Sequence, residues 1–184
     1  MKYIPLALSL LAAGPALAID WALDVDASTV TIETTAFGRD VLGEFSNFEA
    51  DIRLDPTNLG NALIEGRVMV VSGDTGNPQY NSEMTGSHGL NGSDHPVASF
   101  VSESIAASEN CEDGDGECYV ASGTLTLAGS AQPVDLVFRL SIAEGRAIAD
   151  GLITVVRQEF GIGSDNWGAS ATTVEVRLHI EATA

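Results

Sequence analysis

The sequence predicts an all-β protein, an eight-stranded antiparallel β-barrel with one long loop or short helix over an end. Three observations lead to this prediction. Apolar and polar residues alternate with a period of two along most of the chain, as they do in strands with one buried face. Short turns separate most of these segments, and short connections join antiparallel neighbours. The length after residue 18 suits one domain, and it contains no internal repeat.

The alternation is clearest in residues 173–182, where every even position is apolar and every odd position from 175 to 181 is charged or histidine. Turn residues punctuate the pattern at 55–58, 128–130 and 144–145. The eight predicted strands are residues 28–36, 41–54, 62–72, 97–106, 119–128, 134–142, 146–157 and 173–182.

One long connection interrupts the meander. Residues 73–96 are polar and rich in glycine, and residues 77–88 could hold a short helix that covers one end of the barrel. Eight strands with one apolar face each form either a sandwich or a barrel. We favour the barrel, because closure removes exposed strand edges.

Small residues at predicted inward positions bear on whether the interior is hollow. They leave volume for a ligand, although glycine in a strand equally marks a bulge or a barrel corner. The small inward positions are Gly43, Ala50, Gly66, Ala121, Gly123 and Ala149.

The first 18 residues have the features of a secretory signal peptide. A cationic start at Lys2 precedes an apolar run, and Ala16 to Ala18 form a small-residue cleavage site. A transmembrane anchor would need about 20 apolar residues. We therefore expect cleavage near Ala18, a periplasmic or secreted location, no stable membrane insertion and a mature domain of residues 19–184.

The charge balance excludes several partners. The chain has 8 lysines and arginines against 26 acids, for a net charge of -18. Lys2 is the only lysine, so residues 19–184 carry seven arginines and a net charge of -19. Duplex nucleic acid and anionic membranes attract clustered cations, so neither is an expected partner.

Two cysteines, Cys111 and Cys118, enclose an acidic segment and predict a disulfide in an exported chain. Alternating Asp113, Asp115 and Glu117 offer calcium binding as an alternative, but the segment lacks the length of the usual twelve-residue loop. A redox site is weaker still, because the cysteines are not spaced as C-x-x-C.

Catalytic motifs are scarce. The sequence has no H-E-x-x-H pair and no G-x-S-x-G elbow. His179 should face solvent by alternation, and a metal shared by His88, Asp94 and His95 is a weak alternative. We predict neither an enzyme nor a cofactor.

Six segments, in order, resemble the YceI family of secreted, lipocalin-like polyisoprenoid-binding proteins. One departure falls in the long connection, where residues 81–84 and 89–90 replace the family's Asp-x-His-Leu stretch and following aromatic residue. It puts ligand identity in question more than fold. The matching segments are Trp21–Asp24, Val41–Phe48, Asp74–Asn77, His95–Phe100, Gly123–Val134 and Arg157–Gly163.

The resemblance implies a carrier for a long-chain amphiphilic lipid, such as an isoprenoid, quinone or fatty-acid derivative. Arg39 and Arg157 are the candidates for head-group contacts, although the acidic charge favours a neutral head. The predicted apolar lining is Phe45, Ile64, Val68, Phe100, Leu125, Phe138, Leu140, Val176 and Leu178.

Two alternatives stay open at this stage. The first is a solid-core acidic envelope protein that acts through its surface in stress response or adhesion. The second is an isomerase or cyclase on the same barrel, which would need a buried ionisable group beside the tunnel. A homodimer through an exposed strand face is also plausible, because Met69 and Val71 are predicted to point outward.

Overall fold

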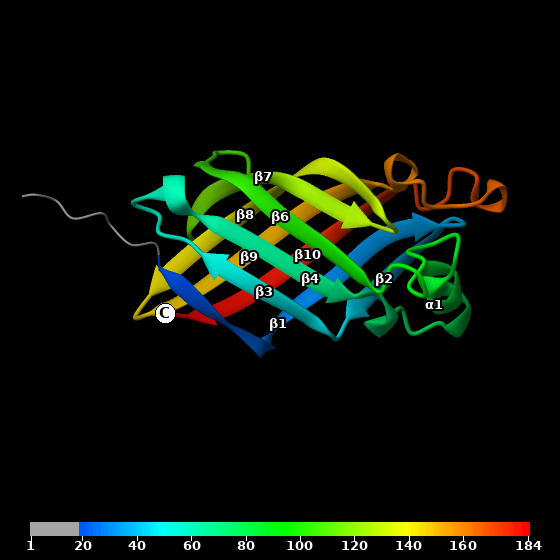
Figure 1. Ribbon diagram of the computed structural model, residues 1–184, viewed down its shortest axis with the longest axis horizontal. Coiled ribbons are helices and arrows are strands. Elements are labelled where there is room, and N and C mark those ends of the chain that lie inside the picture. Colours follow the sequence, from blue (N-terminus) through cyan, green and yellow to red (C-terminus); the bar gives the residue numbers. More distant parts are fainter. Residues whose placement is uncertain (1–18) are drawn as a thin grey trace, which may run out of the picture.

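Figure 1 shows the computed structural model of the chain, which describes residues 19–184. Ten strands and one α-helix occur within these residues. The strands are β1 (Asp20–Ala36), β2 (Arg39–Phe45), β3 (Phe48–Arg53), β4 (Leu63–Met69), β5 (Gly73–Asp74), β6 (Val97–Ala107), β7 (Glu117–Leu127), β8 (Ser130–Ala143), β9 (Arg146–Val156) and β10 (Thr173–Thr183). The helix α1 spans Pro78–Thr85, and short 3-10 turns occupy Leu59–Asn61, Val70–Ser72, Arg157–Phe160 and Asp165–Trp167.

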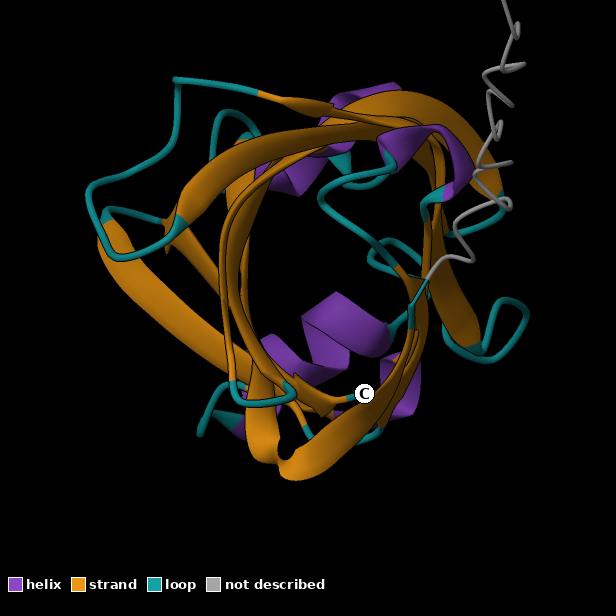
Figure 2. Ribbon diagram, turned by 90° about the vertical axis from the view of Figure 1, so that its left-hand side faces the viewer, coloured by secondary structure: helices purple, strands orange, loops and turns teal. Residues whose placement is uncertain are grey.

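The sheet closes because β1 pairs with β10 on one side and with β2 and β3 on the other. Strands β2 and β3 are the two halves of one bent barrel strand, and β5 is a two-residue extension beside β2. Every pairing is antiparallel. The result is the predicted closed eight-stranded barrel. Figure 2 looks down the axis of this barrel. The predicted signal peptide lies outside the described residues.

Several strand boundaries differ from the prediction. For example, β8 starts at Ser130, four residues before its predicted start. The predicted strand 41–54 breaks between Phe45 and Phe48, and the predicted strand 62–72 ends at Met69 in a 3-10 turn. In that turn Val70 is buried, and its N–H donates to the carbonyl of Pro96 at 2.9 Å.

The first strand starts at Asp20, eight residues before its predicted start. The prediction missed these residues because a bulge interrupts the alternation of apolar and polar residues in this strand. The β1–β10 register shifts between Asp24 and Thr29. At this point the Ser28 hydroxyl donates to the Asp24 carbonyl at 2.7 Å and accepts from the Glu181 N–H at 3.0 Å. A bulge adds unpaired residues to one strand, so the strict alternation of period two is lost there.

Buried apolar side chains close the end of the barrel opposite α1, which we call the distal end. Its buried residues are Trp21, Leu54, Leu140, Ala147 and Ala182. The Trp21 indole N–H donates to the Leu54 carbonyl at 2.8 Å, which satisfies the one polar atom of that side chain. These residues also border the interior cavity, so the barrel is closed at this end but not filled.

The predicted disulfide between Cys111 and Cys118 is present and closes a loop ahead of β7, with Cα atoms 5.8 Å apart. Two arginines attach this loop to the barrel wall. Arg139 donates to the Gly116 carbonyl at 3.0 Å, and Arg177 pairs with the Glu112 carboxylate at 2.9 Å. The loop is thus a structural addition outside the barrel.

Candidate functional site

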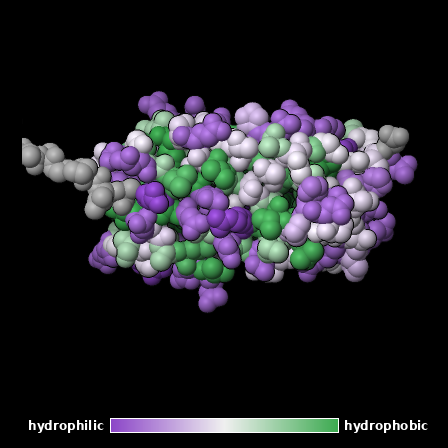
Figure 3. Space-filling view, in the orientation of Figure 1, coloured by the Kyte–Doolittle hydropathy of each residue, from purple (hydrophilic) through white to green (hydrophobic). Residues whose placement is uncertain are grey.

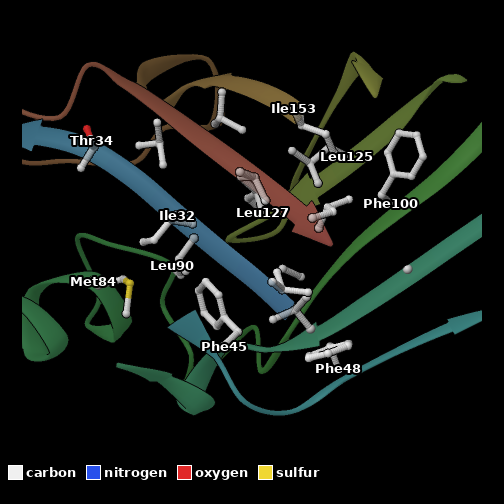
Figure 4. A pocket seen from close by; sticks show the side chains of 18 of the residues that line it. Ile32, Thr34, Phe45, Phe48, Met84, Leu90, Phe100, Leu125, Leu127 and Ile153 are labelled. Carbon is white, nitrogen blue, oxygen red and sulfur yellow. The ribbon is translucent and has the colours of Figure 1, made fainter. Parts of the chain in front are cut away.

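An apolar cavity of about 560 Å³ lies inside the barrel and opens at the α1 end. Figure 4 shows side chains from several strands and from the long connection pointing into it. The nine residues predicted to line the interior all border this cavity: Phe45, Ile64, Val68, Phe100, Leu125, Phe138, Leu140, Val176 and Leu178. That they contact a ligand stays a prediction.

Only half of the small inward residues contribute to the hollow. Ala50, Gly66 and Ala149 border the cavity, and a Cβ atom built on Gly66 would meet nothing within 4 Å. By contrast, a Cβ atom on Gly123 would lie 2.3 Å from the Val101 carbonyl oxygen, at the β6 bulge.

The other two small residues serve packing. A Cβ atom on Gly43 would lie 3.0 Å from the Ile32 side chain, and Ala121 is fully buried in the core. Of the two explanations given for the small residues, volume therefore applies at Ala50, Gly66 and Ala149, and a bulge applies at Gly123. Gly43 and Ala121 are small because their neighbours pack closely.

Three segments form the mouth of the cavity: the β1–β2 hairpin tip, α1 with its following turn, and the loop 157–172. Their lining residues include Phe37 from the hairpin tip, Tyr80, Met84 and Leu90 from α1 and its following turn, and Trp167 from the loop. In Figure 1 the three segments lie at the same end of the barrel.

Hydrogen bonds join these segments across the mouth. The Trp167 indole N–H donates to the Glu83 carboxylate at 3.3 Å. The Gly163 N–H donates to the His88 carbonyl at 2.7 Å, and the Phe37 N–H donates to the Ser170 hydroxyl at 3.1 Å. The mouth is consequently one connected structure, although its parts are far apart in the sequence.

The long connection is anchored by an asparagine that sequence reasoning treated only as a departure. Asn81 accepts from the Thr75 N–H at 2.7 Å and donates to the Asp74 carboxylate at 2.7 Å. The bond from Asn81, followed by one from the Gly76 N–H, lowers the pKa of Asp74. Asn77 caps α1 by accepting from the backbone of Gln79 at 2.9 Å. The Asn-Pro pair at 77–78 is the sequence signal for this cap.

The two arginines proposed for head-group contact lie in different places. Arg157 borders the cavity but is only 5% exposed. Its guanidinium donates to the carbonyls of Ser170 at 3.0 Å, Ile162 at 2.8 Å and Gly168 at 2.7 Å, and it lies over the Trp167 ring. Arg39 is exposed and is not among the lining residues. Arg157 therefore holds the mouth loop in shape, and three of its five N–H donors are already used.

Most polar side chains of the lining lie at the mouth. They are Thr34, Thr75, Gln79, Tyr80, Glu83, His88, Ser164, Asn166 and Ser170. The other polar lining residues are Glu49, Arg67, Ser99 and Arg157, and the rest of the wall is mainly aliphatic and aromatic. An amphiphile would therefore fit with its polar end at the mouth and its apolar chain toward the distal end.

Outside the cavity, the described residues bear on the metal and histidine predictions. No group of three or more His, Cys, Asp or Glu side chains able to hold a metal ion occurs among the described residues. His179 lies on the outer wall, as predicted, where its hydrogen bond with Asp150 at 2.7 Å raises its pKa above 6.5. No described helix is long and apolar enough to cross a membrane.

Met69 and Val71 are predicted to form an exposed strand face for a homodimer, and only Val71 is exposed. Val71 is 69% exposed, whereas Met69 is half-buried. The dimer itself stays a prediction.

Comparisons with known proteins agree on the family. The model of the YceI-like domain matches residues 21–184. A UPF0312 protein of Ectopseudomonas mendocina (strain ymp) is 29% identical over 183 residues, which cover 94% of this chain and 92% of the relative. The crystal structure of BcnA from Burkholderia cenocepacia superposes with a TM-score of 0.78 and 26% identity, covering 88% of this chain and 99% of that one.

A third similar structure is a polyisoprenoid binding domain from Saccharophagus degradans, implicated in plant cell wall breakdown. It superposes with a TM-score of 0.65 at 16% identity, covering 92% of this chain and 99% of that domain. At this identity the likeness shows a shared fold. With the family model matched along nearly all of the described residues, the chain belongs to the YceI-like family.

Proposed function

We propose that this protein is an exported, non-enzymatic carrier that holds one long-chain amphiphilic lipid inside its barrel. The ligand is an isoprenoid, a quinone or a fatty-acid derivative. The observation that carries the proposal is the apolar cavity of about 560 Å³, which is closed by buried side chains at one end and opens at the other. The polyisoprenoid binding domain of Saccharophagus degradans, which has the same fold, adds support.

The cavity volume sets the size of the apolar chain. A water molecule takes up about 30 Å³ in the liquid, and a methylene group is of similar size. A cavity of about 560 Å³ therefore has room for about 19 such groups. Each buried methylene contributes about 0.8 kcal/mol, which is about a fourfold gain in affinity. Affinity should consequently rise with chain length until the cavity is full.

The polar end of the ligand is proposed to be neutral. The chain carries a net charge of -18, so a phosphorylated head would enter against the overall field. Two arginines border the cavity. Arg157 is committed to backbone carbonyls, and Arg67 pairs with the carboxylates of Glu65 at 2.7 Å and Asp51 at 3.1 Å. Glu83 lies at the mouth. Hydroxyl, amide and carbonyl groups can instead bond with the polar side chains of the mouth.

Export to the periplasm or medium is part of the proposal. The signal-peptide features of residues 1–18 support it. The Cys111–Cys118 disulfide supports it as well, because such bonds persist in oxidising compartments.

The cavity also weighs against the alternative of a solid-core protein that acts only through its surface. A protein of that kind needs no apolar interior volume, and empty apolar volume lowers stability. A carrier, by contrast, requires it.

A titration series tests the proposal. Delipidated protein is titrated with straight-chain alcohols of increasing length in competition with the fluorescent probe N-phenyl-1-naphthylamine. We expect affinity to rise up to about 19 carbons and then level off. A parallel series of alkyl phosphates should bind more weakly at every length. Failure of the probe and of all alcohols to bind would reject the carrier function, and preferred binding of the phosphates would reject the neutral head.

A further inference from the structure

We infer that the tip of the β1–β2 hairpin, residues Phe37, Gly38 and Arg39, docks the cavity mouth on the surface of a zwitterionic lipid bilayer. The inference goes beyond the proposed function, since it concerns where the protein meets lipid and not what the cavity holds. It rests on the position, exposure, backbone conformation and free charge of these residues.

The position of the tip links it to the cavity. Phe37 is a lining residue, and its N–H donates to the Ser170 hydroxyl of the mouth loop. The hairpin extends past the barrel at the same end as α1 in Figure 1. A surface that Phe37 enters would therefore face the opening through which a lipid passes.

The fold buries little of the Phe37 ring. Phe37 is 61% exposed, one of the most exposed large apolar side chains of the described residues. It also has a φ of 52°, followed by Gly38 with a φ of 74°. Two successive positive φ angles define the type of tight hairpin turn that favours Asn, Asp or Gly at its first position. A bulky residue in this conformation is unusual.

The opposite end of the barrel provides an internal comparison. The β8–β9 turn at Glu144 and Gly145 has nearly the same backbone, with φ angles of 53° and 77°. There the first turn position carries a charged side chain that water solvates. The turn itself thus has no need of an aromatic residue, and the aromatic residue occurs at the end that holds the mouth.

Arg39 completes the tip with an unused positive charge. The other arginines among residues 19–184 bond to carboxylates or backbone carbonyls, whereas the Arg39 guanidinium has neither an ion pair nor a hydrogen bond. The adjacent Asp40 carboxylate accepts from the Thr35 hydroxyl at 3.1 Å. A ring beside a free guanidinium suits a membrane interface, where the ring enters the acyl boundary and the cation reaches lipid phosphate.

The remaining surface selects the kind of lipid. Figure 3 shows hydrophilic side chains over much of the visible face, with apolar ones scattered between them. A net charge of -18 opposes approach to an anionic bilayer or to a second copy. A stable protein interface also needs about 800 Å² per partner, more than a hairpin tip of three residues offers. A zwitterionic surface, which needs only one ring and one cation, fits the tip.

Flotation with vesicles of phosphatidylethanolamine and phosphatidylcholine tests the inference. The variants are F37N, which keeps a residue suited to the turn, and R39Q. The matched control is L42N, because Leu42 is 65% exposed on the same hairpin but does not line the cavity. Binding of N-phenyl-1-naphthylamine to each variant reports separately on the cavity.

We expect F37N to lower vesicle binding at least about tenfold, since burial of a phenyl ring is lost. R39Q should lower it by a smaller factor, and L42N should leave it unchanged. Probe binding should be the same in the parent, R39Q and L42N, because Arg39 and Leu42 do not line the cavity. Equal vesicle binding by F37N and the parent would overturn the inference, as would a parent protein that does not float at all. A loss of dimer in F37N by analytical ultracentrifugation would also overturn it, in favour of a second copy. None of these results affects the carrier function, which fails only if the probe does not bind.

Discussion

Replacing Gly66 with a larger residue tests whether the interior of the barrel is hollow or solid. Gly66 lies in the middle of β4, opposite Ala50 and Phe100, and it borders the cavity. A Cβ atom there meets nothing within 4 Å, so a side chain at this position starts in open space beside the cavity. We predict that G66L stabilises the ligand-free protein and shortens the longest chain that it binds.

The size of both effects follows from the volume. Leucine adds four carbon atoms, about 120 Å³, or about a fifth of the cavity. Four fewer methylenes buried from the longest ligand cost about 3 kcal/mol, about a hundredfold in affinity, whereas chains of about 14 carbons or fewer should bind as before. Burial of the new side chain and loss of a strand glycine should stabilise the ligand-free protein by about 1 to 2 kcal/mol.

The assays are urea unfolding of delipidated protein and competition titration with alcohols of 10 to about 20 carbons. G123A is the control, because its methyl group would collide with the Val101 carbonyl and should destabilise the fold. If G66L destabilises the protein as G123A does, the interior is already full and the reasoning is refuted. An unchanged length limit would refute the assignment of the cavity as the ligand site.

Three further predictions concern stability. R157M should unfold about 6 to 12 °C lower in a thermal melt, because one buried and two part-buried carbonyls lose their donor at about 1 kcal/mol each. An unchanged melting temperature would show that these carbonyls find other donors. Replacing Cys111 and Cys118 together with serine should lower the free energy of unfolding in urea by about 2 to 3 kcal/mol, since the closed loop is short. Probe binding should not change, because the loop is outside the barrel. Weaker probe binding would show that the loop affects the cavity. The hydrogen bond with Asp150 raises the pKa of His179, so protonated His179 stabilises the folded protein. This stabilisation is fully present below pH 6.5 and is lost as the pH rises through the folded pKa. H179Q should reduce this loss of stability with rising pH, and equal pH profiles of stability for the two proteins would contradict the prediction.

Periodicity predicted the barrel well because the same physical constraint acts along every strand. One face packs inside and the other meets solvent, so the lining residues of β4, β8 and β10 could be assigned by counting in twos. The same rule failed in β1, where the bulge near Ser28 offsets the register. It also failed to show the break between β2 and β3, since Ser46 and Asn47 fit either a strand or a bend.

The mouth could not be predicted in the same way, because its contacts join distant parts of the chain. Nothing in the local sequence of Arg157 indicates that its donors serve carbonyls at 162, 168 and 170. The bond between Trp167 and Glu83 spans 84 positions. Phe37 had no periodic signal at all, and only its backbone conformation and exposure show that it is unusual.

The central claim is that the barrel carries one neutral amphiphile, and native mass spectrometry of protein purified without detergent tests it most directly. We predict a single adduct per chain, with the mass of an uncharged lipid whose apolar tail fills about 560 Å³. A spectrum that contains only the bare chain, or a polyprenyl phosphate adduct, would contradict this account.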